Sequence, residues 1–306
     1  MPEPAISIQG LSRHFADVKA VEKLHFDIQA GEMFGLVGPD GAGKTTTIRL
    51  LCGILTPTEG TATILGLDLI RDIEKIKPQI GYLSQRFSLY PDLTVDENIE
   101  FFAEIHEVGD YKLRRDELLD FTRLTQFRGR LANQLSGGMK QKLALACTLV
   151  HKPKIIYLDE PTTGVDPVSR RDFWKILSSL LSEGITIVMT TPYLDEAERC
   201  SHVGLMNGGV LLEMDTPQVV KDRMVGSVLE IVTPDVHAAH TLLTTDKSLL
   251  GVQAFGDRLN VVIRDAKADA ERIVSQLKAN KIEITQTRII PTSLENVFIS
   301  LMSKSD

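Results

Sequence analysis

Residues 32–45 read EMFGLVGPDGAGKT: an apolar run, a glycine-rich turn, and then a lysine and a threonine. The last eight of these fit the pattern G-x-x-x-x-G-K-[ST]. The apolar run predicts a buried strand, and the spacing of Ile48, Leu51 and Leu55 predicts a helix over 43–54. A strand, a glycine turn and a helix in this order form a phosphate-binding loop, because the amides and the dipole of the helix start attract anions.

The side chains of this loop have predicted tasks. Lys44 supplies a mobile positive charge for β- and γ-phosphates, and the Thr45 hydroxyl can bind Mg²⁺. We expect Asp40 to face outward, because backbone amides do the cradling. The predicted nucleotide contacts of the loop are Gly38, Pro39, Asp40, Gly41, Ala42, Gly43, Lys44, Thr45 and Thr46. Taken alone, the motif could still be an ordinary glycine turn followed by a lysine.

A second motif lies at residues 155–160, Ile-Ile-Tyr-Leu-Asp-Glu. A buried strand that ends in two carboxylates can deliver Asp159 to a metal ion and leave Glu160 to polarise a water molecule. The alternative is a strand end with two solvated acids. The two motifs together predict a nucleoside triphosphatase that binds ATP and Mg²⁺, with Glu160 as a catalytic residue and with Thr45 and Asp159 at the metal.

The chain has 306 residues, more than the roughly 250 at which single cores stop growing, so we expect two domains. We expect residues 1–226 to form an α/β domain, because the apolar runs at 154–158 and 185–190 suit a parallel sheet. Between these runs we expect a helix at 169–183, and ahead of them a helical insertion at about 87–150. Residues 227–306 predict a small α+β domain in the order βαββαβ, which resembles a ferredoxin-like fold. Its expected strands are 227–232, 249–255, 258–263 and 283–289, and its expected helices are 235–245, 266–278 and 293–303.

Composition excludes several classes of protein. A hydrophobic content of 43% excludes wholesale disorder, and no run approaches the roughly 18 apolar residues of a membrane-spanning helix. The first residues, MPEPAISIQG, lack the features of a signal peptide, so we expect a cytoplasmic protein. The net charge of −7 argues against nucleic acid as a main partner. Three isolated cysteines predict neither a disulfide framework nor a zinc site.

A second glycine motif, LSGGMKQ, occupies residues 135–141 ahead of an amphipathic helix. Ser136 is a natural N-cap, and Gly137 and Gly138 leave the first amides of the helix open to an anion. One chain therefore carries two phosphate-receptive helix starts. A single nucleotide could be gripped by one of them from each of two chains.

With this motif, the first 225 residues or so resemble the ATP-binding subunit of an ABC transporter, because Ser136–Gln141 matches the signature of that family. The resemblance implies nucleotide contacts from Ser136, Gly137, Gly138, Gln141 and the D-loop residue Asp166. It implies that Gln85, in the Q-loop, serves catalysis and the metal, and that Phe15 stacks on adenine. An ordinary strand or turn aromatic is the alternative for Phe15. A head-to-tail dimer with two ATP molecules between facing subunits, either identical or different, is implied as well.

Further phrases resemble subunits of ABC-2-type exporters, particularly multidrug exporter ATPases: GPDGAGKTT, LSGGMKQKLALACTLV, VDPVSRR, YLDEAE and the terminal SLENVFISLM. This implies an ATP-hydrolysing subunit, peripheral on the inner face of the cell membrane, that powers a separate integral membrane permease. We expect the permease to dock near Gln85 and residues 87–130, with Phe87, Leu89, Tyr90 and Leu93 as candidates; core packing is the alternative for these four. The C-terminal domain could stabilise the dimer, regulate it or contact the permease.

One departure concerns catalysis. The family has a switch histidine just before Tyr193, but here the residue is Pro192, which has no donor on its side chain or its backbone nitrogen. We therefore expect slow or partner-dependent hydrolysis; the alternative is that Glu160 suffices and Pro192 only shapes the turn.

Three other function classes predict different sequence features. Ribosome-acting relatives typically carry two cassettes, and this chain has one signature. Chromosome ATPases place a long coiled coil between the loop and the signature, and no heptad run is visible between Lys44 and Ser136. A non-hydrolysing or weakly hydrolysing regulatory partner in a heterodimeric assembly stays open because of Pro192.

Overall fold

The computed structural model describes residues 3–85 and 88–302. The chain divides into two compact units, Met1–Thr216 and Pro217–Asp306, which are described separately. The division falls ten residues before the predicted boundary at Gly226. The reason is helix α8 (Pro217–Asp222), which packs against α11 (Leu294–Met302) and so belongs to the C-terminal unit.

The centre of the first unit is a six-stranded sheet in the order β10-β9-β3-β8-β7-β6, parallel except for the β9–β10 hairpin. Its strands are β3 (Met33–Val37), β6 (Ile80–Leu83), β7 (Ile155–Asp159), β8 (Thr186–Thr191), β9 (His202–Asn207) and β10 (Val210–Asp215). Every residue of β3, β7 and β8 is buried, as expected for strands covered on both faces. The continuous apolar runs in the sequence predicted these strands correctly.

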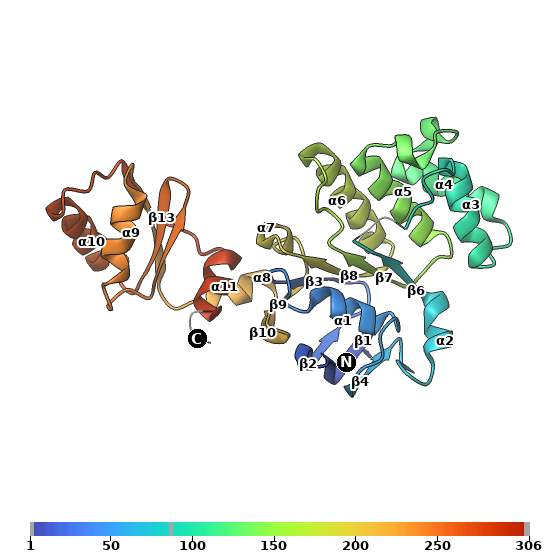
Figure 1. Cartoon of the computed structure of the whole chain (residues 1–306), viewed down its shortest axis with the longest axis horizontal. Coiled ribbons are helices and arrows are strands. Elements are labelled where there is room, and N and C mark those ends of the chain that lie inside the picture. Colours follow the sequence, from blue (N-terminus) through green and yellow to red (C-terminus); the bar gives the residue numbers. More distant parts are fainter. Residues whose placement is uncertain (1–2, 86–87, 303–306) are drawn as a thin grey trace. The chain divides into compact units, whose positions relative to one another are not determined.

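Helices cover both faces of this sheet. Figure 1 shows α5 (Gly137–Leu149) and α6 (Pro167–Ser182) on one side and α1 (Lys44–Leu51) on the other. The predicted helical insertion between β6 and β7 consists of α3 (Val95–Ile105), α4 (Tyr111–Thr122) and α5. A capping box starts α3, since Thr94 accepts a bond from the Glu97 amide and the Glu97 side chain accepts one from the Thr94 amide. Two single-turn α-helices, α2 (Ile73–Ile76) and α7 (Leu194–Ala197), also belong to this unit.

A second, antiparallel sheet in this unit was not predicted from the sequence. Its order is β2-β1-β4-β5, and its strands are β1 (Ile6–Phe15), β2 (Val18–Ile28), β4 (Glu59–Ile64) and β5 (Leu67–Asp68). Ile6, Ile8 and Ile28 join the buried core that also contains residues of α1 and β3. This sheet carries Phe15 at the end of β1.

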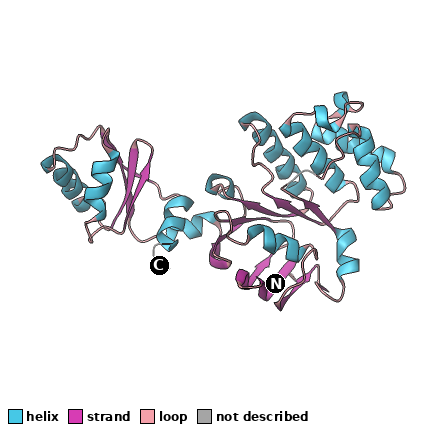
Figure 2. Ribbon diagram, viewed as in Figure 1, coloured by secondary structure: helices cyan, strands magenta, loops and turns pink. Residues whose placement is uncertain are grey.

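The C-terminal unit follows the predicted element order, with boundaries shifted by up to three residues. Its elements are β11 (Ser227–Val232), α9 (Val236–Thr244), β12 (Gly251–Phe255), β13 (Arg258–Ile263), α10 (Ala268–Ala279), β14 (Gln286–Ile290) and then α11. The strands form one antiparallel sheet in the order β12-β13-β11-β14. Figure 2 shows α9 and α10 against one face of this sheet, where alternate strand residues such as Leu229, Ile231 and Val261 form a core with them.

Within the part of the chain that the structure describes, no helix has both the length and the apolar composition needed to cross a membrane.

Candidate nucleotide-binding site

The glycine loop lies between β3, which ends at Val37, and α1, which begins at Lys44, so the predicted strand–loop–helix order is confirmed. Gly43 is the N-cap of α1 and has a φ of 100°. A Cβ at this position would lie 2.4 Å from the carbonyl oxygen of Ala20. Only glycine fits there, because a side chain would clash with this oxygen and the left-handed backbone disfavours other residues.

Lys44 is a buried cation, 3% exposed. Its Nζ donates to the carbonyl oxygens of Gly38 at 2.8 Å and Pro39 at 3.0 Å, and it lies 3.3 Å from Oε1 of Glu160. A buried charge needs such partners, because burial without them is costly. The ammonium group is therefore held inside the loop, against the carboxylate that follows β7.

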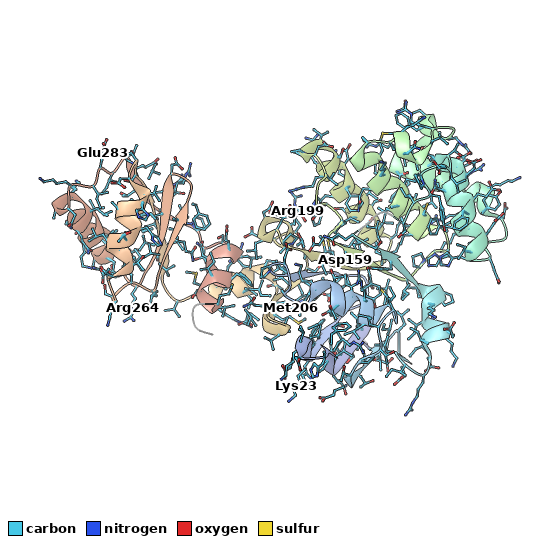
Figure 3. The ribbon with its side chains drawn as sticks, viewed as in Figure 1. Lys23, Asp159, Arg199, Met206, Arg264 and Glu283 are labelled. Carbon is cyan, nitrogen blue, oxygen red and sulfur yellow. The ribbon has the colours of Figure 1, made fainter. Side chains whose placement is uncertain are left out.

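Asp159 (labelled in Figure 3) is fully buried at the carboxyl end of β7. Its Oδ1 accepts hydrogen bonds from the hydroxyls of Thr45 at 2.8 Å and Thr190 at 2.7 Å. Its Oδ2 lies 3.5 Å from the hydroxyl of Tyr82, a group whose pKa is raised by burial, so that it stays protonated at neutral pH. The sequence predicted that Asp159 and Thr45 lie together; it did not reveal Tyr82 and Thr190.

Glu160 has a side chain that is only 8% exposed and a backbone φ of 49°, unusual for a residue other than glycine. Its amide donates to Oγ1 of Thr190 at 2.9 Å. Its Oε2 accepts from Nε2 of Gln85 at 3.0 Å. The structure thus brings Gln85 against Glu160 and Glu160 against Lys44, and all three line one cavity.

A cavity of about 600 Å³ opens over the loop. Asp40 lines it and is exposed to solvent, and the outward orientation of its side chain stays a prediction. Phe15, 41% exposed, also lines it, and the guanidinium of Arg13 lies 4.5 Å from the centre of its ring. The predicted site residues that line the cavity are Phe15, Asp40, Gly41, Ala42, Gly43, Lys44, Thr45, Thr46, Gln85 and Glu160.

The second glycine motif contributes no lining residue to this cavity. Ser136 caps α5, accepting a bond from the Met139 amide at 3.3 Å, and Gly137 beside it is exposed. Asp166 caps α6 by accepting from the amides of Val168 and Ser169. The Ser169 hydroxyl and these amide bonds lower the pKa of Asp166, so it is a carboxylate at neutral pH. Gln141 is 5% exposed, and its Nε2 is buried without a hydrogen-bond partner.

Pro192 lies half-buried in the bend between β8 and α7, where the sequence predicted the switch position. Close to it the structure reveals a functional candidate that sequence reasoning missed. Glu196, in α7, is 1% exposed and accepts bonds from Thr162 and Thr191.

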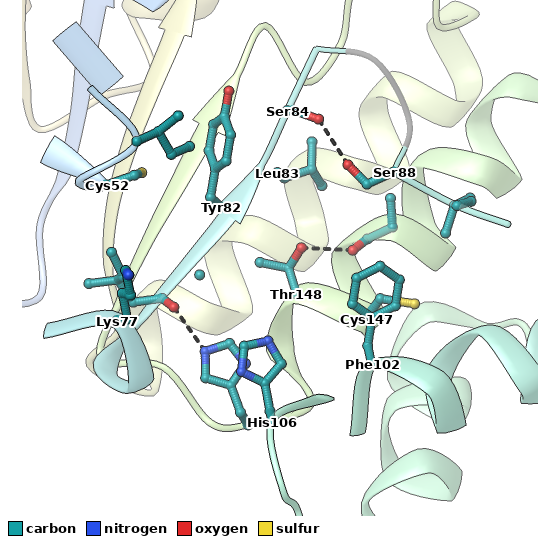
Figure 4. A pocket seen from close by; sticks show the side chains of 16 residues that line it. Cys52, Lys77, Tyr82, Leu83, Ser84, Ser88, Phe102, His106, Cys147 and Thr148 are labelled. Atoms are coloured by element: carbon teal, nitrogen blue, oxygen red, sulfur yellow. Dashed lines mark hydrogen bonds between the residues drawn. The ribbon is translucent and has the colours of Figure 1, made fainter. Parts of the chain in front are cut away.

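A separate cavity of about 330 Å³ lies between β6 and the helical insertion. Figure 4 shows Tyr82, Leu83 and Ser84 on one side and Phe102 and His106 on the other. Of the four predicted docking residues, Leu89 lines this cavity. Leu89 and Leu93 are both half-buried. Tyr90 is 44% exposed with its ring against Phe101, and Phe87 lies outside the described residues.

Comparison with known proteins agrees with this geometry. Residues 21–163 match the family model described as ABC transporter. The chain is 47% identical over 238 residues to the probable multidrug ABC transporter ATP-binding protein YbhF of Escherichia coli, although the match spans only 41% of that protein. It is 33% identical over 305 residues to the Nod factor export ATP-binding protein I of Ralstonia nicotianae, covering 98% of this chain and 94% of that protein.

Solved structures show the same fold. The chain resembles cbiO1 of Clostridium perfringens, part of an ABC transporter complex, with a TM-score of 0.66 and 27% identity over 72% of this chain and 92% of that one. It also resembles a dimeric ATP-binding cassette bound to ADP and phosphate, with a TM-score of 0.63 and 26% identity over 69% of this chain and 98% of that one.

Proposed function

Because the chain belongs to the family of ABC transporter ATP-binding proteins, we propose that it binds and hydrolyses ATP to power an ABC-2-type exporter through a separate membrane permease. The observation that carries the proposal is the meeting of Lys44, Glu160 and Gln85 at one cavity that Phe15 also lines. The names of its relatives, which include multidrug and Nod factor export proteins, support an exporter.

Mg²⁺ fits the donors beneath the cavity. The Thr45 hydroxyl and the Asp159 carboxylate, 2.8 Å apart, are the hard oxygen ligands that this ion prefers, and the Gln85 carbonyl could supply a third. Bound there, Mg²⁺ would neutralise charge on the β- and γ-phosphates. Lys44 would hold the same phosphates, Phe15 would stack on the base, and Glu160 would polarise the attacking water.

A second ATP-binding subunit is part of the proposal. Ser136 and Gly137 present an exposed helix start that lies outside the cavity of their own chain. A two-fold related subunit could bring that helix start to the γ-phosphate held by the first chain. The dimer could pair identical or different subunits.

We place the permease at the cavity beside β6. It adjoins Ser84, one residue before the Gln85 that contacts Glu160, so a helix seated there would sense the nucleotide site. Two stacked histidines, His106 and His151, line it; burial lowers the pKa of both, that of His151 to about 4, so they are neutral at pH 7. The cavity is mostly apolar, with Lys77, which pairs with Glu74, as the charged residue of its lining. Such a lining suits an apolar helix of a membrane protein, and that contact would hold this chain on the inner face of the membrane.

Reconstitution tests the proposal. We expect the chain, purified from membranes in mild detergent, to retain a partner with several membrane spans. ATP turnover in lipid vesicles should be measurable and should rise when that partner is present. Zero turnover beside the partner, with ATP binding intact, would favour the regulatory, non-hydrolysing alternative.

Pro192 makes a separate prediction about rate. Because proline offers no donor at the switch position, we expect Pro192→His to raise ATP turnover at least about ten-fold; one well-placed donor to developing charge contributes about 10²–10³-fold in other enzymes. Pro192→Ala, which removes the ring but adds no donor, is the control. Equal turnover in all three proteins, with and without the partner, would contradict the role given to this residue.

We further propose that residues 227–306 form a ferredoxin-like accessory domain. The element order and the antiparallel strand order β12-β13-β11-β14 support this reading.

A further inference from the structure

Glu196 is a buried carboxylate that lines neither cavity and belongs to no nucleotide motif. Its Oε1 accepts a hydrogen bond from the Thr162 hydroxyl at 2.6 Å, and its Oε2 accepts one from the Thr191 hydroxyl at 2.9 Å. The Nε of Arg170 lies 3.5 Å from Oε1, an ion pair too long to be a good hydrogen bond. A buried charge with this many partners is strongly constrained in position.

The three partners come from three segments that matter for hydrolysis. Thr162 follows Glu160 by two residues. Thr191 ends β8, immediately before Pro192. Arg170 lies in the first turn of α6, the helix that Asp166 caps. One carboxylate therefore connects the segment after the catalytic glutamate, the switch turn and the D-loop helix.

The switch turn is fixed on both sides of Pro192. Oγ1 of Thr191, while donating to Glu196, also accepts from the Tyr193 amide at 3.0 Å. The Arg170 guanidinium lies 5.1 Å from the centre of the Tyr193 ring. Pro192 itself has no donor, so Thr191 and Tyr193 make the contacts that hold this turn to Glu196 and Arg170.

The same network restrains the backbone near Glu160. Glu160 has a φ of 49°, a conformation that persists in a non-glycine residue only where the surroundings enforce it. On one side its amide bonds Thr190; on the other its carbonyl oxygen accepts from the Thr163 amide at 3.2 Å. Thr162, between them in the chain, is held by Glu196.

We propose that Glu196 is a positioning residue for ATP hydrolysis, which holds the Glu160 segment, the Pro192 turn and the start of α6 in one arrangement. The inference rests on the proposed function. The proposal predicts an effect on the rate of hydrolysis and not on the binding of ATP. Lys44, which would hold the phosphates, contacts Gly38, Pro39 and Glu160 and does not contact Glu196 or its threonine partners.

Glu196→Gln tests the inference in the full chain with its partner. It keeps the volume of the side chain but removes the charge that faces Arg170 and replaces one acceptor by a donor. We expect kcat for ATP to fall at least about ten-fold, since small misplacements cost up to about 10²-fold, while KM for ATP stays within about two-fold. Glu196→Asp, which keeps the charge, should restore part of kcat.

Glu230→Gln is the matched control. Glu230, in β11 of the C-terminal unit, is also a buried glutamate paired with arginines, Arg258 at 3.2 Å and Arg288 at 2.7 Å. Loss of the Glu230 charge should lower the melting temperature of the chain without changing kcat. All rates are measured well below the melting temperature of each variant.

The outcomes separate the two proposals. A Glu196→Gln kcat within two-fold of the parent, or a control that loses as much kcat, would overturn the role of Glu196 alone. A rise of KM in step with the fall of kcat would do the same. A parent without any turnover would overturn the proposed function together with this inference.

Discussion

Replacing Glu160 by glutamine is expected to reduce ATP hydrolysis by about 10²–10⁴-fold while ATP binding is retained, because a positioned general base contributes rate enhancements of that size. The substitution keeps the shape of the side chain and the acceptor for Gln85 but removes the negative charge that polarises water. Lys44 keeps the carbonyl oxygens of Gly38 and Pro39, so the loop stays folded. Its ion pair with Glu160 is lost, and the freed ammonium should bind phosphate at least as tightly.

The measurements are single-turnover hydrolysis and equilibrium binding of a fluorescent ATP analogue. Glu183→Gln makes the same chemical change at the exposed C-terminal end of α6 and should alter neither. If hydrolysis falls less than ten-fold, another group activates the water. If binding is lost with the rate, Glu160 acts by maintaining the loop.

The glycine loop and the strand-end carboxylates could be predicted from sequence because each is encoded in contiguous residues. In the loop, the sequence itself dictates the strand, the left-handed turn at Gly43 and the start of α1. Asp159 and Glu160 follow a run whose apolar, β-branched character requires burial on both faces. At these positions the same short stretch of sequence determines both the backbone structure and the functional side chains.

The surroundings of Asp159 and Glu196 could not be predicted in the same way. Tyr82 and Thr190 reach Asp159 from β6 and β8, and only the strand order shows that these strands flank β7. Glu196 lies in an acid-rich run, residues 193–198, which is typical of a solvent-exposed helix start. Its burial depends on Thr162 and Arg170, which tertiary packing brings to it.

The antiparallel sheet and the unit boundary depend on tertiary structure as well. The register of β1 with β2 shifts at Gln9, Leu11 and Arg13, which weakens the alternating pattern that marks a strand. The short helix α8 looks like a continuation of the first unit in sequence, and only its packing against α11 assigns it to the second.

Lys44→Ala is expected to weaken ATP binding about 10- to 100-fold at the site of its own chain, because charge-assisted hydrogen bonds contribute about 1.5–3 kcal/mol each. Lys44 is the cation buried in the loop, and alanine leaves the phosphates without it. Lys75→Ala removes an exposed lysine paired with Asp72 and should leave binding unchanged.

Gly137→Glu is the counterpart of Lys44→Ala on the other side of the proposed shared site. A Cβ at Gly137 meets only the Gly164 carbonyl oxygen at 3.9 Å, an ordinary contact, so the chain should fold. The new carboxylate suits the start of α5 but repels the phosphate that a facing subunit would present. At ATP concentrations that saturate only the parent, each variant alone should therefore lack hydrolysis. Lys44→Ala damages the loop of its own chain, and Gly137→Glu damages the helix start that the chain offers to its partner.

Mixing the two variants tests directly whether each ATP lies between the loop of one subunit and the Ser136–Gly137 helix start of another. A mixed dimer contains one site with both lesions and one site with neither. We predict that the mixed dimer occludes one ATP per two chains, and that the mixture regains hydrolysis that neither variant shows alone. A mixture as inactive as its components, beside a purified parent chain that dimerises with itself and hydrolyses ATP, would contradict the shared site.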